Sequence, residues 1–231
     1  MSAVVIDGGL IHYEAFGRGE PVIFIHGWLG SWRYWMGTME VLAPDYRTYA
    51  PDLWGFGDSD KSKERYTVAD YADLVRDFMD ELGVIRASLV GHALGATVAL
   101  YFGTKYPELV SRLAMVSLPV TSDAISGRLL DFANDSLLSK MFWWRRIAHS
   151  EVQQEAEKTA KGVILVSINS VLGIDAHELI ERIPHPTLIV YGERDNVVDP
   201  TPSKSLNVLR PNLRPVGLAE SRHFPMLEQA N

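Results

Sequence analysis

Gly91-His92-Ala93-Leu94-Gly95 joins a short apolar run at residues 87–90 to a helical pattern at residues 94–106. A Gly-x-Ser-x-Gly sequence between a strand and a helix forms a nucleophile elbow, a tight turn that lifts its central side chain out at the top of a sheet. Glycine is needed on both sides because the strained turn brings the backbone close to its neighbours. Ala93 occupies the central position, and its methyl group can neither attack a substrate nor donate a proton.

Short apolar strands alternate with helices on both sides of this turn. The strands are predicted at residues 3–6, 10–16, 22–25, 47–50, 87–90, 112–117, 187–191 and 213–219. The clearest helix begins at Thr67, which caps it together with Asp70, and ends near Leu82 with one continuous apolar stripe. This succession predicts an α/β protein with a mostly parallel, doubly wound sheet.

The pattern changes between residues 120 and 183, where helical periodicity continues almost without a strand signal. We expect an all-helical cap at 120–183, lying over the carboxyl ends of the strands, and a core formed by residues 1–119 and 184–231. Within the cap, Trp143 and Trp144 either line a substrate pocket or pack inside the lid. The cap is rich in Leu, Ile, Val and Trp, which favours an apolar acyl or aryl group in the substrate.

The composition narrows the classes of partner and site. Lys and Arg total 22 against 29 Asp and Glu, a net charge of −7, so there is no basic excess for nucleic acid. The absence of cysteine excludes a disulfide scaffold, a thiolate nucleophile and a Cys-ligated metal. The N-terminus lacks a signal-peptide pattern, and apolar runs such as residues 163–166 are far too short for a membrane span. We therefore expect a cytoplasmic protein.

Two polar residues follow later strands in the chain order nucleophile, acid, histidine. Asp195 comes after the strand at 187–191, and His223 comes after the last strand. Ligands of open α/β sheets bind outside the carboxyl ends of the strands, so these side chains are expected to converge on position 93. Each motif alone is weak, but together they predict a catalytic site.

An earlier strand, at residues 22–25, ends in His26-Gly27. The next backbone N–H, that of Trp28, is predicted to pair with the N–H of Leu94 and form an oxyanion hole. His26 itself is expected to support this loop rather than to transfer protons.

These motifs, together with Asp52-x-x-Gly55-x-Gly57-x-Ser59, resemble the α/β-hydrolase superfamily, in particular its single-domain esterase and C–C hydrolase branch with a helical cap. The resemblance implies a serine at position 93 as nucleophile, His223 as general base and Asp195 orienting it. It implies hydrolysis of a small-molecule ester or related acyl compound through an acyl-enzyme, with no metal and no organic cofactor. The same triad serves esterases, thioesterases, lactonases, amidases and C–C hydrolases.

The sequence departs from the family pattern twice. Ala93 replaces the nucleophile, and the chain ends at Asn231, eight residues after His223, where the family continues into a helix on the sheet. Either the sequence is truncated, or the C-terminal helix is absent and apolar sheet surface is exposed.

Three explanations of Ala93 remain open. The chain is a serine hydrolase inactivated at its nucleophile, a natural binding protein without catalysis, or a relative of the epoxide hydrolases and dehalogenases in which Asp occupied position 93. Retention of Asp195 and His223 favours the first, because a protein that only binds has no need of both. Leu94 argues against the third, since those relatives usually carry an aromatic residue after the nucleophile.

Overall fold

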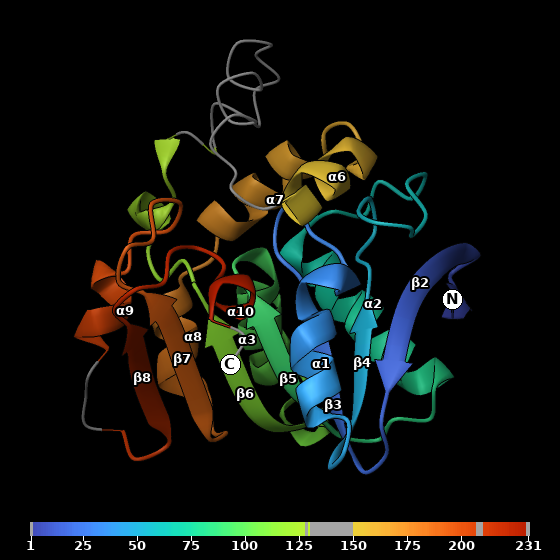
Figure 1. Cartoon of the computed structure of the whole chain (residues 1–231), viewed down its shortest axis with the longest axis horizontal. Helices are drawn as coiled ribbons and strands as arrows, with labels where there is room; N and C mark the ends of the chain where they lie inside the picture. Colours follow the sequence, from blue (N-terminus) through green and yellow to red (C-terminus); the bar gives the residue numbers. More distant parts are fainter. Residues whose placement is uncertain (1, 128, 130–149, 207–209, 230–231) are drawn as a thin grey trace.

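Eight strands form one sheet in the computed structural model, which describes residues 2–127, 129, 150–206 and 210–229 (Figure 1). Their bounds are β1 (Ser2–Ile6), β2 (Gly9–Phe16), β3 (Glu20–Ile25), β4 (Tyr46–Pro51), β5 (Ala87–His92), β6 (Val110–Val116), β7 (Thr187–Gly192) and β8 (Leu213–Leu218). They are ordered β1-β2-β4-β3-β5-β6-β7-β8. The pairs β1–β2 and β2–β4 are antiparallel and all others are parallel. This confirms the predicted mostly parallel sheet.

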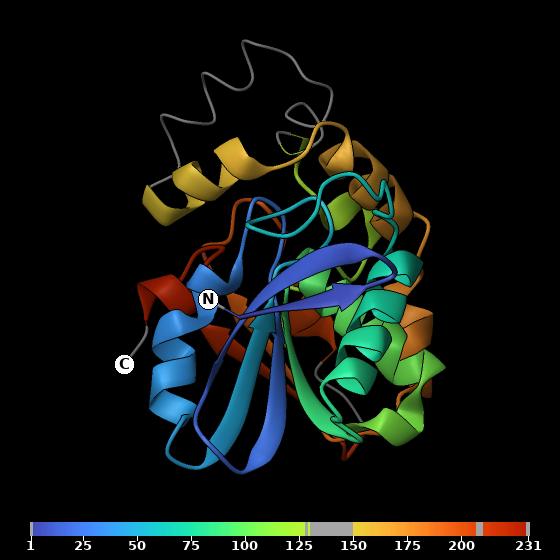
Figure 2. The ribbon, with the colours of Figure 1, turned by 90° about the vertical axis from the view of Figure 1, so that its right-hand side faces the viewer.

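Helices cover both faces of the sheet, as expected for a doubly wound fold (Figure 2). One face carries α2 (Val68–Glu81), α3 (Leu94–Lys105) and α8 (Ala176–Arg182), with α3 packed on β5 and β6 and contacting both other helices. On the other face lie α1 (Met36–Leu42) and the short α10 (Pro225–Glu228), which contact each other. The short α9 (Thr201–Ser205) contacts β8.

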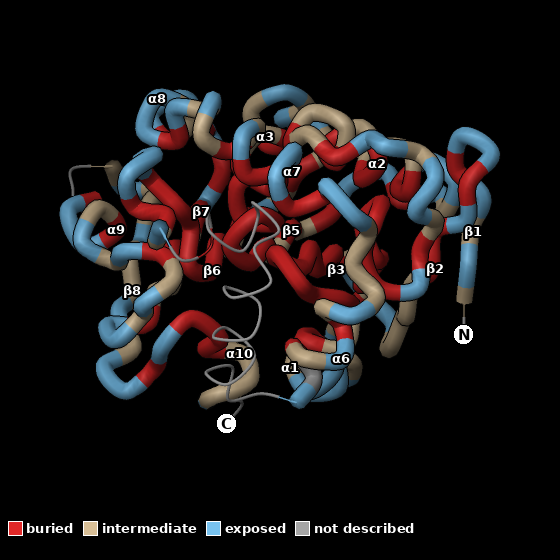
Figure 3. The backbone as a smooth tube through the Cα atoms, turned by 90° about the horizontal axis from the view of Figure 1, so that it is seen from above, coloured by how far each residue is buried: buried red, intermediate tan, exposed pale blue. Residues whose placement is uncertain are grey.

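Most residues of the central strands are buried (Figure 3), although alternate residues of β5, β6 and β7 are only partly shielded from solvent. Ile23, Phe24 and Ile25 of β3 are fully shielded from solvent. Such continuous apolar strands are typical of parallel sheets, whose two faces both meet helices. The packed core therefore fixes the carboxyl ends of β3 and β5. The loops that contain His26 and Ala93 begin there.

The segment predicted as a cap contains α6 (Ser150–Lys158), α7 (Val163–Leu172) and α8 in its described part. Figure 1 shows α6 and α7 above the ends toward which the arrows of β5 and β6 point. In contrast, α8 packs beside the sheet on α3. The division into a core of residues 1–119 and 184–231 and a cap of residues 120–183 stays a prediction, and Trp143 and Trp144 lie outside the described residues.

No single helix among the described residues is long and apolar enough to cross a membrane. Helices α7 and α8 reach that length and composition only when taken together, and they are bent by 62° where they meet.

An apolar groove of about 710 Å³ lies on the α1 side of the sheet. It runs across the middle strands and is lined by, among others, Val22, Leu42, Val90, Leu113 and Leu188. Position 93, Asp195 and His223 are not among its lining residues, so the groove is separate from the predicted catalytic site.

Candidate active site

The turn between β5 and α3 has the strained backbone expected of an elbow. Ala93 has φ 48° and ψ −108°, which few residues with a side chain adopt. A Cβ atom added to Gly91 would lie 2.1 Å from the carbonyl oxygen of Gly95, and one added to Gly95 would lie 2.2 Å from that of Ile25. The Ala93 N–H donates to the carbonyl of Val116 at 2.9 Å, which ties the turn to β6. Both flanking glycines are therefore sterically required.

Asp195 and His223 form a buried hydrogen-bonded pair. The Nδ1 atom of His223 lies 2.9 Å from Oδ2 of Asp195, and their side chains expose only 7% and 1% of their surface. The other carboxylate oxygen of Asp195 accepts the N–H groups of Val197 at 2.8 Å and Val198 at 3.0 Å. With Asp195 ionised, Nδ1 of His223 carries the proton of the neutral ring, and Nε2 is its unprotonated nitrogen.

The electrostatics of this pair keep the carboxylate charged. Burial raises the pKa of Asp195, but the charge and hydrogen bond of His223 and the N–H groups of Val198 and Val197 outweigh it, so the pKa lies below its ordinary value. An ionised carboxylate on Nδ1 stabilises the imidazolium that forms when Nε2 accepts a proton.

The loop that carries His223 is held directly against the elbow. The Nε2–H of His92, the residue before Ala93, donates to the carbonyl of His223 at 2.8 Å, and the rings of the two histidines lie 4.7 Å apart. The hydroxyl of Ser117, which follows β6, donates to the same carbonyl at 3.4 Å. The structure therefore brings together the three segments that contain Ala93, Asp195 and His223.

His92 is a neutral structural element of this arrangement. Its side chain is fully buried, and burial lowers its pKa to about 3, with the nearby His223 acting in the same direction. The His223 carbonyl accepts a hydrogen bond from Nε2 of His92, and Nδ1 has no hydrogen-bond partner among the residues that the structure describes. The sequence offered no signal for this role, because His92 is simply the second residue of the elbow.

The loop after β3 lies beside the elbow. A Cβ atom added to Gly27 would lie 2.9 Å from the carbonyl oxygen of His92 and 3.2 Å from the Cβ of Ala93. Trp28 and Leu94 are both buried. The assignment of their backbone N–H groups as a pair of oxyanion donors stays a prediction.

His26 supports this loop from beneath. Its Nδ1–H donates to the carbonyl of Gly27 at 2.8 Å, and its Nε2 accepts the N–H of Leu53 at 3.0 Å. Burial lowers the pKa of His26, so the ring is neutral with both nitrogens engaged. This geometry fits the expected supporting role and leaves no ring nitrogen for proton transfer.

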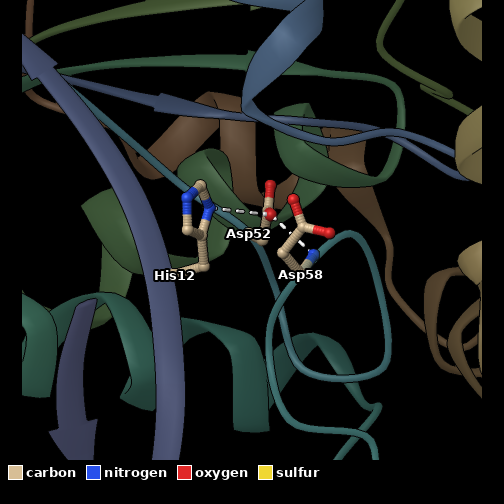
Figure 4. Close-up of side chains that lie close together, drawn as sticks. All are labelled: His12, Asp52 and Asp58. Atoms are coloured by element: carbon tan, nitrogen blue, oxygen red, sulfur yellow. Dashed lines mark hydrogen bonds and ion pairs between the residues drawn. The ribbon is translucent and has the colours of Figure 1, made fainter. Parts of the chain in front are cut away.

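A second polar cluster, His12, Asp52 and Asp58, holds the loop that begins with Asp52 (Figure 4). The Asp52 carboxylate is fully buried and accepts the N–H of Trp32 at 2.8 Å, the N–H of Asp58 at 2.9 Å and Nδ1 of His12 at 3.2 Å. The hydrogen bond to Asp52 raises the pKa of His12. The three side chains lie close enough to ligate a cation, but both Asp52 oxygens are occupied by donors. The cluster is explained as a loop support.

An ion-pair network joins α6 to the core and was not predicted. The guanidinium of Arg33 contacts Asp58 at 3.1 Å and Glu155 at 3.3 Å, and the ammonium of Lys158 contacts the same two carboxylates at 3.0 and 3.2 Å. Glu155 is 1% exposed. The two contacts that cross from α6 to the core, Glu155–Arg33 and Lys158–Asp58, join residues 122 and 100 positions apart, so no local sequence pattern signals them.

Comparison with known proteins supplies the family. The family described as alpha/beta hydrolase fold matches residues 20–155, more than half of the chain. The chain is 35% identical to the soluble epoxide hydrolase of Corynebacterium sp. strain C12 over 114 residues, which are 49% of this chain and 40% of that protein. It is 24% identical to the pimeloyl-[acyl-carrier protein] methyl ester esterase of Vibrio campbellii over 242 residues, 95% of this chain and 93% of that protein.

Solved structures share the whole described architecture. A meta-cleavage product hydrolase from Pseudomonas fluorescens IP01, solved as a serine-to-alanine mutant with acetates, is 25% identical with a TM-score of 0.77, covering 99% of this chain and 93% of that one. The matches to several curated relatives are shorter, and there the chain spans less than half of their length. The extent of the family match and the agreement in fold lead to one conclusion: the chain belongs to the α/β-hydrolase fold family.

Proposed function

We propose that this chain is a serine hydrolase for carboxylic esters in which alanine replaces the nucleophile at position 93. The observation that supports it best is the buried 2.9 Å hydrogen bond between Asp195 and His223 beside a strained elbow whose central side chain is inert. Relatives named as an esterase and a meta-cleavage product hydrolase favour hydrolysis over other chemistries.

With a serine at position 93, the proposed reaction has two balanced steps. Nε2 of His223 accepts the hydroxyl proton as the serine oxygen adds to the ester carbonyl, and the same proton passes to the departing alcohol as the C–O bond breaks. Water then adds to the acyl-enzyme, again losing its proton to His223, and the carboxylic acid leaves as the serine regains its proton. Backbone N–H groups of Trp28 and Leu94 would stabilise the oxyanion of each tetrahedral intermediate.

A second candidate is an epoxide hydrolase type of mechanism with an aspartate at position 93. The observation in its favour is the 35% identity to a soluble epoxide hydrolase over half of the chain. A carboxylate there would open an epoxide by attack on carbon, and water would then release the diol. Leu94 remains the argument against this alternative. The third candidate is a natural small-molecule binding protein without catalysis, which needs no nucleophile at position 93.

One pair of variants separates these proposals. Ala93→Ser and Ala93→Asp are assayed against p-nitrophenyl acetate, butyrate and octanoate and against styrene oxide. If the proposed function is correct, Ala93→Ser hydrolyses the esters and Ala93→Asp does not. The acyl chain length of the best substrate then indicates the size of the pocket that binds the acyl group. Epoxide opening by Ala93→Asp would favour the second candidate. Folded variants that turn over neither class, while the unmodified chain binds an ester intact, would favour the binding protein.

A further inference from the structure

The loop after β3 is held in a strained conformation by contacts from several elements. Leu29 has φ 58°, a left-handed conformation that costs free energy for a residue with a branched side chain. The hydroxyl of Tyr34 donates to the Leu29 carbonyl at 2.6 Å, and His26 holds the carbonyl of Gly27. Strain of this kind persists only when surrounding contacts maintain it. Trp28 lies between these two anchored positions.

The side chain of Trp28 is fixed by helix α7 rather than by its own loop. Its indole N–H donates to the hydroxyl oxygen of Ser167 at 2.9 Å, across 139 residues of sequence. Ser167 is fully buried and donates its own proton to the carbonyl of Val163 at 2.7 Å, so its oxygen is committed as the acceptor for the indole. A buried hydrogen bond that loses one partner leaves the other unsatisfied, at a cost in free energy.

Helix α7 is itself firmly seated. Its buried side chains are Val163, Ile164, Ser167, Ile168 and Val171. It contacts both α2 and α3, and the hydroxyl of Ser170 accepts the N–H of Val68 at the start of α2 at 2.9 Å. Packing against the core therefore fixes the position of α7. Because Ser167 lies on α7 and bonds the indole of Trp28, it fixes the position of that side chain too.

We infer that Ser167 is a positioning residue for the oxyanion hole: through the indole of Trp28, helix α7 sets the direction of the Trp28 backbone N–H. The inference rests on the proposed function and adds a residue to it. The Trp28 N–H lies in the same planar peptide group as the Gly27 carbonyl, which His26 holds, and the indole is attached to the Cα atom at the end of that group. The bond to Ser167 therefore fixes the group at its second end. Releasing the indole allows the backbone dihedrals of Trp28 to relax and moves the donor away from the place where negative charge develops.

The two serines of α7 offer a matched comparison. Ser167→Ala and Ser170→Ala each delete one hydroxyl that hydrogen-bonds α7 to another segment, the first buried and the second partly buried, and the indole of Trp28 bonds Ser167. Each of these substitutions is introduced separately into Ala93→Ser. A third variant, Trp28→Phe in the same background, removes the indole N–H and keeps the backbone N–H of residue 28. Ester hydrolysis is resolved into kcat and KM, and thermal melting reports stability.

Ser167→Ala and Trp28→Phe are expected to lower kcat by about tenfold to about a hundredfold, with KM within about twofold, since a displaced oxyanion donor affects mainly the transition state. Combining them should cost no more than either alone, because both delete the same hydrogen bond. Ser170→Ala should keep kcat and lower the melting temperature by about 3 °C. Fluorescence or circular dichroism confirms that each variant is folded.

Unchanged kcat in Ser167→Ala would overturn the inference, as would effects of Ser167→Ala and Trp28→Phe that multiply in the double variant. Equal losses of kcat in Ser167→Ala and Ser170→Ala would reduce Ser167 to a structural role and also overturn it. If Ser167→Ala does not fold, Trp28→Phe decides the question: a lower kcat with KM nearly unchanged supports the inference, and an unchanged kcat overturns it. A parent Ala93→Ser that hydrolyses no ester would remove the proposed function, and the inference with it.

Discussion

Ala93 occupies the most demanding backbone position of the site, yet its side chain contributes no chemistry. The turn keeps φ at 48°, flanked by two glycines that tolerate no Cβ atom, and a buried acid–histidine pair lies on the adjoining loops. Such strain is maintained at functional sites because the surrounding structure imposes it. The sequence predicted the elbow, Asp195 and His223 because each follows a strand. It could not predict that His92 would anchor the His223 loop, since that contact depends on three-dimensional packing.

At the residue scale, Asp195→Asn in the Ala93→Ser protein should lower kcat by about 10⁴-fold with little change in fold. The amide would keep an oxygen for the N–H groups of Val197 and Val198 and turn its NH₂ toward Nδ1 of His223, forcing the proton onto Nε2. Asp199→Asn is the control, because the Asp199 side chain is exposed and accepts the N–H of Thr201 two residues later. Initial rates of ester hydrolysis measure both, and equal rates for the two variants would refute the assigned pair.

At the scale of elements, strands and long helices were predictable, while short helices and contacts distant in sequence were not. Helix α2 has the predicted capping box, in which Thr67 accepts the N–H of Asp70 and Asp70 accepts the N–H of Thr67. The strands at residues 22–25 and 87–90 appear within β3 and β5. The sequence did not predict helix α1, because this helix has only seven residues and no side-chain cap at its start. The link from Trp28 to α7 has no local signal at all.

Removing the cap of α2 tests this element. Thr67→Ala should lower the free energy of unfolding by about 1 kcal/mol, because the N–H of Asp70 loses its acceptor. Thr104→Ala, inside α3, is the matched control: its hydroxyl donates to the carbonyl of Leu100 four residues earlier, and alanine is the better helix former. Urea unfolding monitored by circular dichroism gives both values. A loss in Thr104→Ala as large as in Thr67→Ala would contradict the capping argument.

At the scale of the whole molecule, buried neutral histidines make the fold sensitive to acid. Burial lowers the pKa values of His26 and His92, the latter to about 3, whereas an unfolded histidine titrates near its ordinary value. Between these pKa values the unfolded chain binds protons that the folded chain excludes, so the free energy of unfolding falls as the pH falls. For each histidine, the free energy of unfolding begins to fall at about pH 6.5, the ordinary pKa of the imidazole.

His92→Gln isolates one of these contributions. Glutamine retains an N–H donor for the carbonyl of His223 but has no proton to gain. Between about pH 6 and about pH 4, the original chain should lose up to ~1.4 kcal/mol per pH unit more than the variant. Urea unfolding across that range measures the two slopes, and the offset at neutral pH cancels from the comparison. Parallel slopes would show that His92 takes up a proton in the folded state.

We propose that a hydroxyl at position 93 is the one group that the hydrolytic site around Asp195 and His223 lacks. The most direct test of this claim is the initial rate of p-nitrophenyl butyrate hydrolysis by the unmodified chain, by Ala93→Ser, and by Ala93→Ser combined with His223→Gln. The account predicts that Ala93→Ser exceeds the other two on the order of 10⁶-fold, because the members of the triad act as a unit. Equal rates for the unmodified chain and a folded Ala93→Ser, or full activity without His223, would contradict it.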